Sequence, residues 1–258
     1  RSDFTFSISG GTTSLSSATP SSISSSGNVY TLGISLSNTP DGSETLTVNP
    51  DVATAIYDAA GNAAAVIQSN NTATLNDQVI PSFAIDYPAT ANVAGTSFDL
   101  KIKINEAGKG HCVVLADGAT APTSSEVKAG TGSVGATATK SASVDLTAVT
   151  EASLSITKLA SETAYDVYVV AEDASSNLQS SPTKIDVTTT DITSPTVNVD
   201  PSDGSIDVSE GSNITLTFSE AVRKSDDTIL EDNNVDAVVT LKDGDANGTD
   251  IPFDATVN

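Results

Sequence analysis

The sequence predicts an all-β fold made of tandem antiparallel β-sandwiches, of which the first and the last are incomplete. Three observations lead to this prediction. Apolar and polar residues alternate over short segments such as 98–104, as expected for strands with one wet face. Clusters of Gly, Pro, Asn, Asp and Ser separate these segments and indicate turns. Landmark residues also recur at a step of about 114 positions, which is typical of repeated domains.

A turn motif of five residues marks the repeat. It reads Asp-Ala-Ala-Gly-Asn from Asp58 to Asn62 and Asp-Ala-Ser-Ser-Asn from Asp173 to Asn177, each time after an apolar run. An Asp side chain can accept hydrogen bonds from backbone N–H groups further along a turn, and Gly and Asn tolerate left-handed backbone. We therefore expect a hairpin turn at both places.

Two further signals recur at nearly the same step. One is an Asp four positions before a Pro, and the other is a Glu-Ala pair that follows this Asp about 29 positions later. The residues are Asp77, Pro81 and Glu106 in one copy and Asp191, Pro195 and Glu220 in the next. Together with the turn motif, these signals indicate a repeat of about 110 residues.

The repeat divides the chain into three domains. Residues 1–80 form a domain that lacks its first strands, because nothing before Phe4 can serve as them. Residues 81–190 form a complete sandwich, and residues 191–258 form the N-terminal part of a further domain. The chain also begins in mid-pattern without a signal peptide, so we expect it to be a piece of a longer protein.

The expected elements follow from alternation and turn chemistry. In the first domain the expected strands are 4–8, 29–36 and 44–48, and the Ser-rich stretch 21–28 is expected to be a loop. In the second they are 98–104, 111–115, 153–157, 164–171 and 184–188, with a soft segment at 116–143 and a helical turn at 124–128. In the third they are 213–218 and a hairpin of 237–241 with 251–257.

One side chain has a specific predicted contact. Tyr165 stands six positions after Leu159, at the entry to the strand 164–171. This is the spacing of a tyrosine corner, in which the phenol forms a hydrogen bond with the backbone upstream. We expect that bond here.

The charge is strongly acidic. The chain has 258 residues with 11 Lys plus Arg against 33 Asp plus Glu, a formal net charge of −22 and an isoelectric point near 4.1. Such a surface repels nucleic acid and anionic membranes, so neither is an expected partner, and it suits divalent cations or a salty exterior. No apolar run approaches the length of a membrane helix, so membrane insertion is not expected either.

Catalytic chemistry is not expected. Cys112 and His111 are the only Cys and His, and they stand within the strand 111–115, where a lone Cys is usually a small buried hydrophobe. A catalytic Cys would need a base and an orienting partner that the sequence does not show. The sequence also has no phosphate-binding loop after a strand and no HExxH or CxxC motif. We predict that the protein is not an enzyme.

Two family resemblances rest on these motifs. Residues 81–190, with Leu159, the run from Tyr165 to Asp173 and the closing 187–190, resemble a bacterial fibronectin type III-like domain. Residues 194–222 resemble the start of the bacterial Ig-like domains of S-layer and other surface proteins, and 56–62 is similar to the second half of such a domain.

The resemblance implies a structural function. Such domains serve mostly as spacers or adhesin stalks of large secreted or cell-surface bacterial proteins, so an extracellular location is expected. Neighbouring repeats, and a glycan or another cell-surface ligand, are the implied partners. The alternative is a carbohydrate-binding or accessory module attached to an extracellular enzyme. Head-to-tail self-association through the incomplete end domains is a further expectation.

The landmarks predict calcium sites at the domain junctions. In an Ig-like topology the entering linker, the end of the second strand and the turn after the sixth strand share one pole. Oxygen-rich clusters suit Ca²⁺, which takes six to eight oxygen ligands. The candidate ligands are Asp77, Glu106, Asp173 and Asn177 at one junction and Asp191 and Glu220 at the next. The alternative is that each Asp caps a turn and each Glu is solvated or pairs with a backbone N–H.

A second candidate loop lies near the end of the chain. Asp243, Asp245, Asn247 and Asp254 fit the EF-hand loop pattern, except that Asp replaces the bidentate Glu. No helices flank the loop, and strand-like segments do. An ordinary hairpin turn is therefore the favoured interpretation, with a weak Ca²⁺ site as the alternative.

Overall fold

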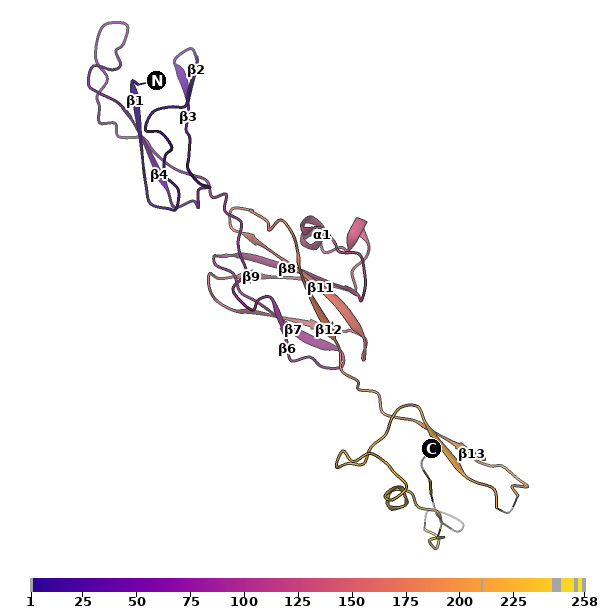
Figure 1. Cartoon of the computed structure of the whole chain (residues 1–258). Helices are drawn as coiled ribbons and strands as arrows, with labels where there is room; N and C mark the ends of the chain where they lie inside the picture. The colour runs from indigo at the N-terminus through magenta and orange to yellow at the C-terminus, as the bar shows by residue number, and fades with distance from the viewer. Residues whose placement is uncertain (1, 210, 243–246, 253–254, 257–258) are drawn as a thin grey trace. The chain divides into compact units, whose positions relative to one another are not determined.

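The computed structural model describes residues 2–209, 211–242, 247–252 and 255–256, and this part of the chain is mostly β-structure (Figure 1). The strands form several antiparallel sheets, as the sequence predicts. The chain divides into two compact units, Arg1–Asp191 and Ile192–Asn258. No helix among the described residues has the length and apolar character needed to cross a bilayer.

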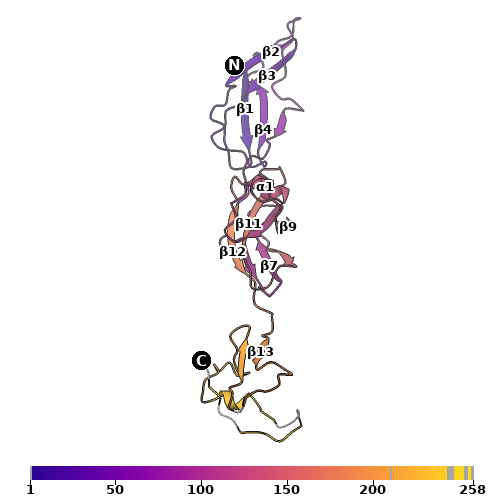
Figure 2. The ribbon, with the colours of Figure 1, turned by 90° about the vertical axis from the view of Figure 1, so that its right-hand side faces the viewer.

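Residues 2–80 contain a small sheet and a hairpin. The sheet has the order β1-β4-β5, with β1 and β4 side by side (Figure 2). Its strands are β1 (Phe4–Ser9), β4 (Thr45–Pro50) and β5 (Thr72–Thr74). Phe6 and Leu46 lie on the apolar face of this sheet and are buried. The predicted strands 4–8 and 44–48 are confirmed.

The hairpin corrects one prediction. The Ser-rich stretch 21–28 was expected to be a loop, but β2 (Ser22–Ser26) pairs with β3 (Val29–Gly33) across Gly27, whose φ is 60°. Strand pairing satisfies backbone groups whatever the side chains are, and Gly is suited to the positive φ of the tight turn. A run of Ser therefore does not exclude a strand when its neighbour has strong β propensity.

Residues 81–190 contain two sheets that share one apolar core. One sheet has the order β10-β7-β6, and the other has the order β12-β11-β8-β9. The strands of the first are β6 (Ala89–Ala91), β7 (Ser97–Ile102) and β10 (Ala152–Thr157). The strands of the second are β8 (Gly108–Ala116), β9 (Lys140–Leu146), β11 (Ala164–Asp173) and β12 (Thr183–Thr188).

The core follows from the alternation of side chains. Phe98, Leu100 and Ile102 of β7 are at most 1% exposed, and they pack with Val114 of β8 and Val167 of β11 in a single cluster. Because these residues come from both sheets, the sheets lie face to face around the cluster (Figure 1). Strands are present at each of the five positions predicted in 81–190.

The four-stranded sheet is apolar on both faces at its centre. Val113 and Val170 point away from the main core and form a second cluster with Val127 of α1 (Ser124–Ala129). This explains why β8 and β11 read as continuous apolar runs. The predicted helical turn at 124–128 is confirmed, and Thr123 and Glu126 close its N-terminus as a capping box.

The second unit contains β13 (Val197–Asp200), which pairs with β14 (Thr215–Phe218), and a 3-10 helix at Val235–Ala237. The strand predicted at 237–241 is wrong, and among the described residues one bridge, between Lys242 and Asp250, lies just beyond the inner ends of the two expected arms. Residues 253, 254 and 257 of the arm predicted at 251–257 lie outside the described residues. Backbone bonds within 231–238 hold this stretch in turns, so its N–H groups are unavailable to a ladder.

The predicted hydrogen bond of Tyr165 is present. The N–H of Ala160 donates to the Tyr165 phenol oxygen at 2.9 Å, and Tyr165 is 5% exposed. The bond joins the segment before β11 to the start of that strand. It confirms the contact expected from the spacing of Leu159 and Tyr165.

Removing this hydroxyl tests the contact. Tyr165→Phe keeps the ring in the core but leaves the Ala160 N–H without its acceptor, so we expect a loss of about 1 kcal/mol in the free energy of unfolding. Tyr87→Phe is the control, because the Tyr87 hydroxyl donates to the exposed Glu151. Urea denaturation of both variants measures the difference. Equal losses in the two variants would contradict the assigned importance of the buried bond.

Candidate functional site

The two Asp-containing turns have the same hydrogen bonds. In the first, Asp58 Oδ1 accepts the N–H groups of Ala60 at 2.9 Å and Asn62 at 2.8 Å. The Asn62 side-chain amide donates to Asp58 Oδ2 at 2.8 Å, and Gly61 has a φ of 88°. The hydrogen bond from the Asn62 side chain is the main cause that lowers the pKa of Asp58. The predicted hairpin turn is confirmed here.

The second turn repeats the pattern at a more buried place. Asp173 Oδ1 accepts the N–H groups of Ser175 and Asn177, both at 2.8 Å, and the Asn177 amide donates to Asp173 Oδ2 at 2.7 Å. Ser176 takes the position of Gly61 with a φ of 71°. Asp173 is only 6% exposed. The predicted turn is confirmed here as well.

This second turn also holds the segment 77–81. The Asn177 side-chain nitrogen donates to the backbone oxygen of Asp77 at 3.2 Å, and the Gln179 side-chain nitrogen donates to that of Pro81 at 3.1 Å. Gln179 is itself fixed, because its side-chain oxygen accepts the N–H of Ala171 at 2.8 Å. The turn after β11 therefore binds the chain that leads into residues 81–190.

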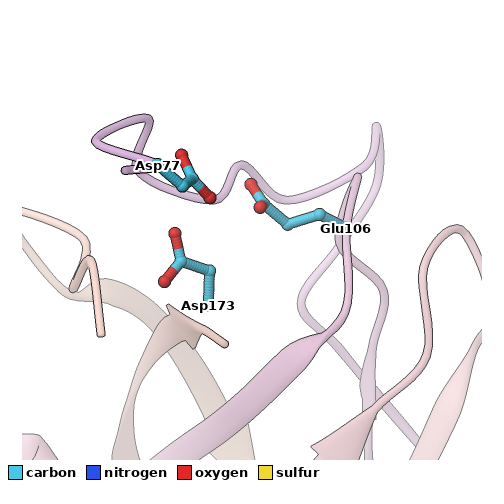
Figure 3. A group of neighbouring side chains, drawn as sticks. All are labelled: Asp77, Glu106 and Asp173. Atoms are coloured by element: carbon cyan, nitrogen blue, oxygen red, sulfur yellow. The ribbon is translucent and has the colours of Figure 1, made fainter. Parts of the chain in front are cut away.

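The structure brings three of the predicted site residues together (Figure 3). Carboxylate oxygens of Asp77, Glu106 and Asp173 all lie within 4.8 Å of one another. Asp77 comes from the segment before Pro81, Glu106 follows β7, and Asp173 ends β11. The convergence expected from the repeat is present, and cation binding to it stays a prediction.

The three carboxylates repel one another. Burial raises the pKa of Glu106, and the charges of Asp173 and Asp77, in that order, raise it further. Asp41 adds a smaller contribution of the same sign. In the part of the chain that the structure describes, no ion pair engages any of the three carboxylates. A bound cation would remove this repulsion.

The donor set suits a hard cation. Carboxylate oxygens are among the ligands that Ca²⁺ prefers, and three residues of this cluster offer them. Asn177 takes a different part from the one predicted, since its amide nitrogen donates to Asp173 and to the Asp77 backbone. It orders the cluster through hydrogen bonds, and a ligand role for its oxygen stays a prediction.

A second acidic cluster was not predicted. Carboxylate oxygens of Asp117, Asp166 and Asp186 also lie within 4.8 Å of one another. Here the ammonium group of Lys184 supplies the positive charge. Its Nζ lies 2.9 Å from an oxygen of Asp166 and 2.9 Å from an oxygen of Asp186. These contacts, with Asp186 first, raise the pKa of Lys184. Asp166 is 1% exposed and pairs directly with Asp186 across β11 and β12, so Lys184 compensates two like charges.

The single Cys and His have structural surroundings. Both lie on β8, as predicted, and the Cys112 side chain is fully buried, which raises its pKa to about 11. His111 Nε2 is 3.7 Å from a Glu172 oxygen, and burial lowers the pKa of His111. Glu172 in turn pairs with Lys128 of α1 at 2.5 Å. A thiol with a raised pKa is a poor nucleophile.

Glu44 is a buried carboxylate at the start of the strand predicted at 44–48, and the sequence gives no sign of its contacts. It is 0% exposed, and its oxygens accept the backbone N–H groups of Thr12, Thr13, Asp41 and Gly42 at 3.0 to 3.3 Å. Burial acts to raise its pKa, but the N–H donors of Thr13 and Asp41 outweigh it and lower the pKa overall. Glu44 thereby joins the loop at 12–13 to the one at 41–42.

The remaining predicted ligands are not tested. Asp191 belongs to the first compact unit and Glu220 to the second, so their meeting stays a prediction. Asp243, Asp245 and Asp254 lie outside the described residues. Beside that loop, Lys242 Nζ is 2.5 Å from Asp250 Oδ1. Asn247 is in the described part, at a turn.

No protein-family model matches the chain, and the comparison with curated proteins found no significant match.

Replacing the buried carboxylate tests its importance. Glu44→Gln keeps the size of the side chain but directs an amide toward backbone N–H donors, so we expect residues 2–80 to lose stability at pH 7. Because the pKa of Glu44 is lowered in the fold, its contribution is present above the unfolded pKa and disappears as the pH falls through the folded value. The variant should therefore lose less stability on acidification than the parent. Hydrogen exchange of peptides from 2–80 measures both effects.

Asp51→Asn is the matched control, since Asp51 is exposed in the same segment. Its hydrogen exchange should resemble that of the parent both at pH 7 and after acidification. Unchanged exchange in Glu44→Gln at pH 7 would contradict the assigned role.

Proposed function

We propose that the chain is a non-catalytic spacer or adhesin stalk segment of a large secreted or cell-surface bacterial protein. Residues 81–190 fit a fibronectin type III-like domain, since they combine a three-stranded sheet and a four-stranded sheet around one core with a tyrosine corner. Such a domain buries the inner face of each sheet. Its two chain termini lie at opposite poles, which suits serial linkage.

One set of contacts supports a spacer most directly. Asn177 and Gln179 bind the backbone of Asp77 and Pro81, so the segment that enters residues 81–190 is held by the turn after β11. A freely jointed linker would have its backbone groups in water. A stalk that holds a binding site at a fixed distance from its anchor needs this kind of restraint.

Calcium would strengthen the restraint. Asp77 is in the entering segment, Glu106 is in the loop between β7 and β8, and Asp173 ends β11, so one cation bound to all three would join these segments. It would also neutralise the repulsion that raises the pKa of Glu106. Extracellular calcium modules bind with dissociation constants on the order of 10⁻⁴ to 10⁻³ M, and this affinity range suits three carboxylates without a complete cage.

Thermal unfolding with and without calcium tests the site. At 10 mM Ca²⁺ we expect the parent protein to gain about 2 kcal/mol over the same protein in EDTA, as linkage predicts for a site of this affinity. Glu106→Gln should lose this gain, because it removes one ligand without touching the Asp173 turn. In EDTA the variant should be at least as stable as the parent, since one of three repelling charges is gone.

Asp117→Asn is the matched control. It removes one carboxylate from the cluster that already contains Lys184, so its calcium gain should equal that of the parent. Mg²⁺ at the same concentration should stabilise less, because it demands a tighter octahedral site. An unfolding transition that EDTA leaves unchanged in the parent would remove the calcium part of the proposal.

A further inference from the structure

Helix α1 covers part of the outer face of the four-stranded sheet. Its Val127 is 1% exposed and packs in one cluster with Val113 of β8 and Val170 of β11, which are both 0% exposed. The helix has only six residues, and an isolated helix of this length is not stable in water. α1 therefore depends on its contact with the sheet.

An ion pair joins the same helix to β11. Lys128 Nζ lies 2.5 Å from one oxygen of Glu172, whose side chain is 12% exposed. The other oxygen of Glu172 lies 3.7 Å from Nε2 of His111 on β8. One carboxylate thus stands between a cation of the helix and an imidazole of the sheet.

His111 is mostly buried. Its side chain is 12% exposed, and among the described residues its Nε2 has no hydrogen-bond partner, since 3.7 Å exceeds the length of a hydrogen bond. A neutral imidazole carries one N–H donor, whereas an imidazolium carries two and a charge. Burial of such a charge without a hydrogen bond is costly. Protonation is therefore disfavoured while this part of the sheet stays covered.

Charged groups surround His111 on the outer face of the sheet. Burial is the main cause that lowers the pKa of His111; the charge of Glu172 opposes it, and the charges of Lys128 and Lys109 lower the pKa further. On the neighbouring strand β9, the residue opposite His111 is Ser143, which is uncharged. Asp145 of β9 lies 3.1 Å from Lys109. The net effect of these surroundings is to favour the neutral imidazole.

We propose that a proton on His111 weakens the packing of α1 on the sheet, so that mild acid loosens residues 124–130 while both sheets stay folded. An imidazolium at this place competes with Lys128 for the carboxylate of Glu172, and it gains hydration when the helix moves away. The coupling is reciprocal, because a packing arrangement that disfavours the proton is itself disfavoured once the proton is bound.

The pH dependence has a defined direction. Because the fold lowers the pKa of His111, its contribution to the stability of α1 is complete above the ordinary value of 6.5 and is lost as the pH falls below it. Movement of α1 uncovers Val113 and Val170. Mild acid would thereby expose an apolar surface that is closed at neutral pH.

NMR of the imidazole tests the coupling in the full chain, where His111 is the only His. In EDTA, which keeps divalent cations away from the cluster around Glu106, we expect the parent to titrate with a pKa below 6.5. Val127→Ser removes the apolar contact of α1 without adding a charge, so the pKa should rise toward 6.5. Val134→Ser is the matched control, because Val134 is 94% exposed, and its pKa should equal that of the parent. A parent pKa at or above 6.5, or a Val127→Ser variant with the pKa of the parent, would overturn the proposal.

Hydrogen exchange tests the movement of the helix. Between pH 7 and pH 5, after correction for the intrinsic pH dependence of exchange, we expect the protection of residues 124–131 in the parent to fall by about threefold or more. His111→Gln cannot take up the proton, so its protection should stay constant. Strand β10, in the other sheet, is the internal control and should keep its protection in both proteins.

Three results of the exchange experiment contradict the proposal. Unchanged protection of α1 in the parent would show that acid does not move the helix, and this result needs no variant. Equal losses in the parent and in His111→Gln would assign the effect to another group. Equal losses in α1 and β10 would indicate general unfolding in acid.

Discussion

The hydrogen bond from a backbone N–H to a carboxylate oxygen organises much of this chain. With 33 acidic and 11 basic residues, most acids cannot find a Lys or Arg. Asp58 and Asp173 use their oxygens to close the two hairpin turns, and Glu44 accepts four N–H groups from two loops. Glu126 caps α1 in the same way. Backbone N–H donors thus stabilise carboxylates that would otherwise only repel one another. Because turns leave N–H groups free to donate, acidic residues are found there.

This interaction also separates structural acids from acids that remain available to a ligand. Asp173 uses both oxygens in its turn and could offer a cation only their remaining lone pairs, whereas within the described residues Glu106 accepts one hydrogen bond, from the side-chain amide of Asn105 at 3.2 Å. Burial, followed by the charges of Asp173 and Asp77, raises the pKa of Glu106. The cluster around Asp166 has the same number of carboxylates but contains Lys184. Two clusters of three carboxylates therefore differ in their demand for an external cation.

The sequence predicted those features that depend on spacing. Strict alternation predicted β7. The Asp-x-x-x-Pro, Glu-Ala and turn landmarks predicted that Asp77, Glu106 and Asp173 lie close together, as they do. It missed β9, whose Ala142 and Val144 face the core among Ser residues and carry little apolar signal. It also missed Asp166, since an acid inside an apolar strand gives no sign of the partner that compensates it. Contacts between residues far apart in the sequence are decided by packing, which local patterns do not encode.

The repeat has a use beyond counting domains, because it allows one part of the chain to serve as the reference for another. A two-stranded ribbon is marginal in water unless an opposing layer covers its apolar side. Ile104 is 0% exposed beneath that layer, and Phe218, 114 positions later in the sequence, is 39% exposed. The second Asp turn and Gln179 bind the backbone of the segment 77–81, and this restraint is the one that the proposed spacer function needs.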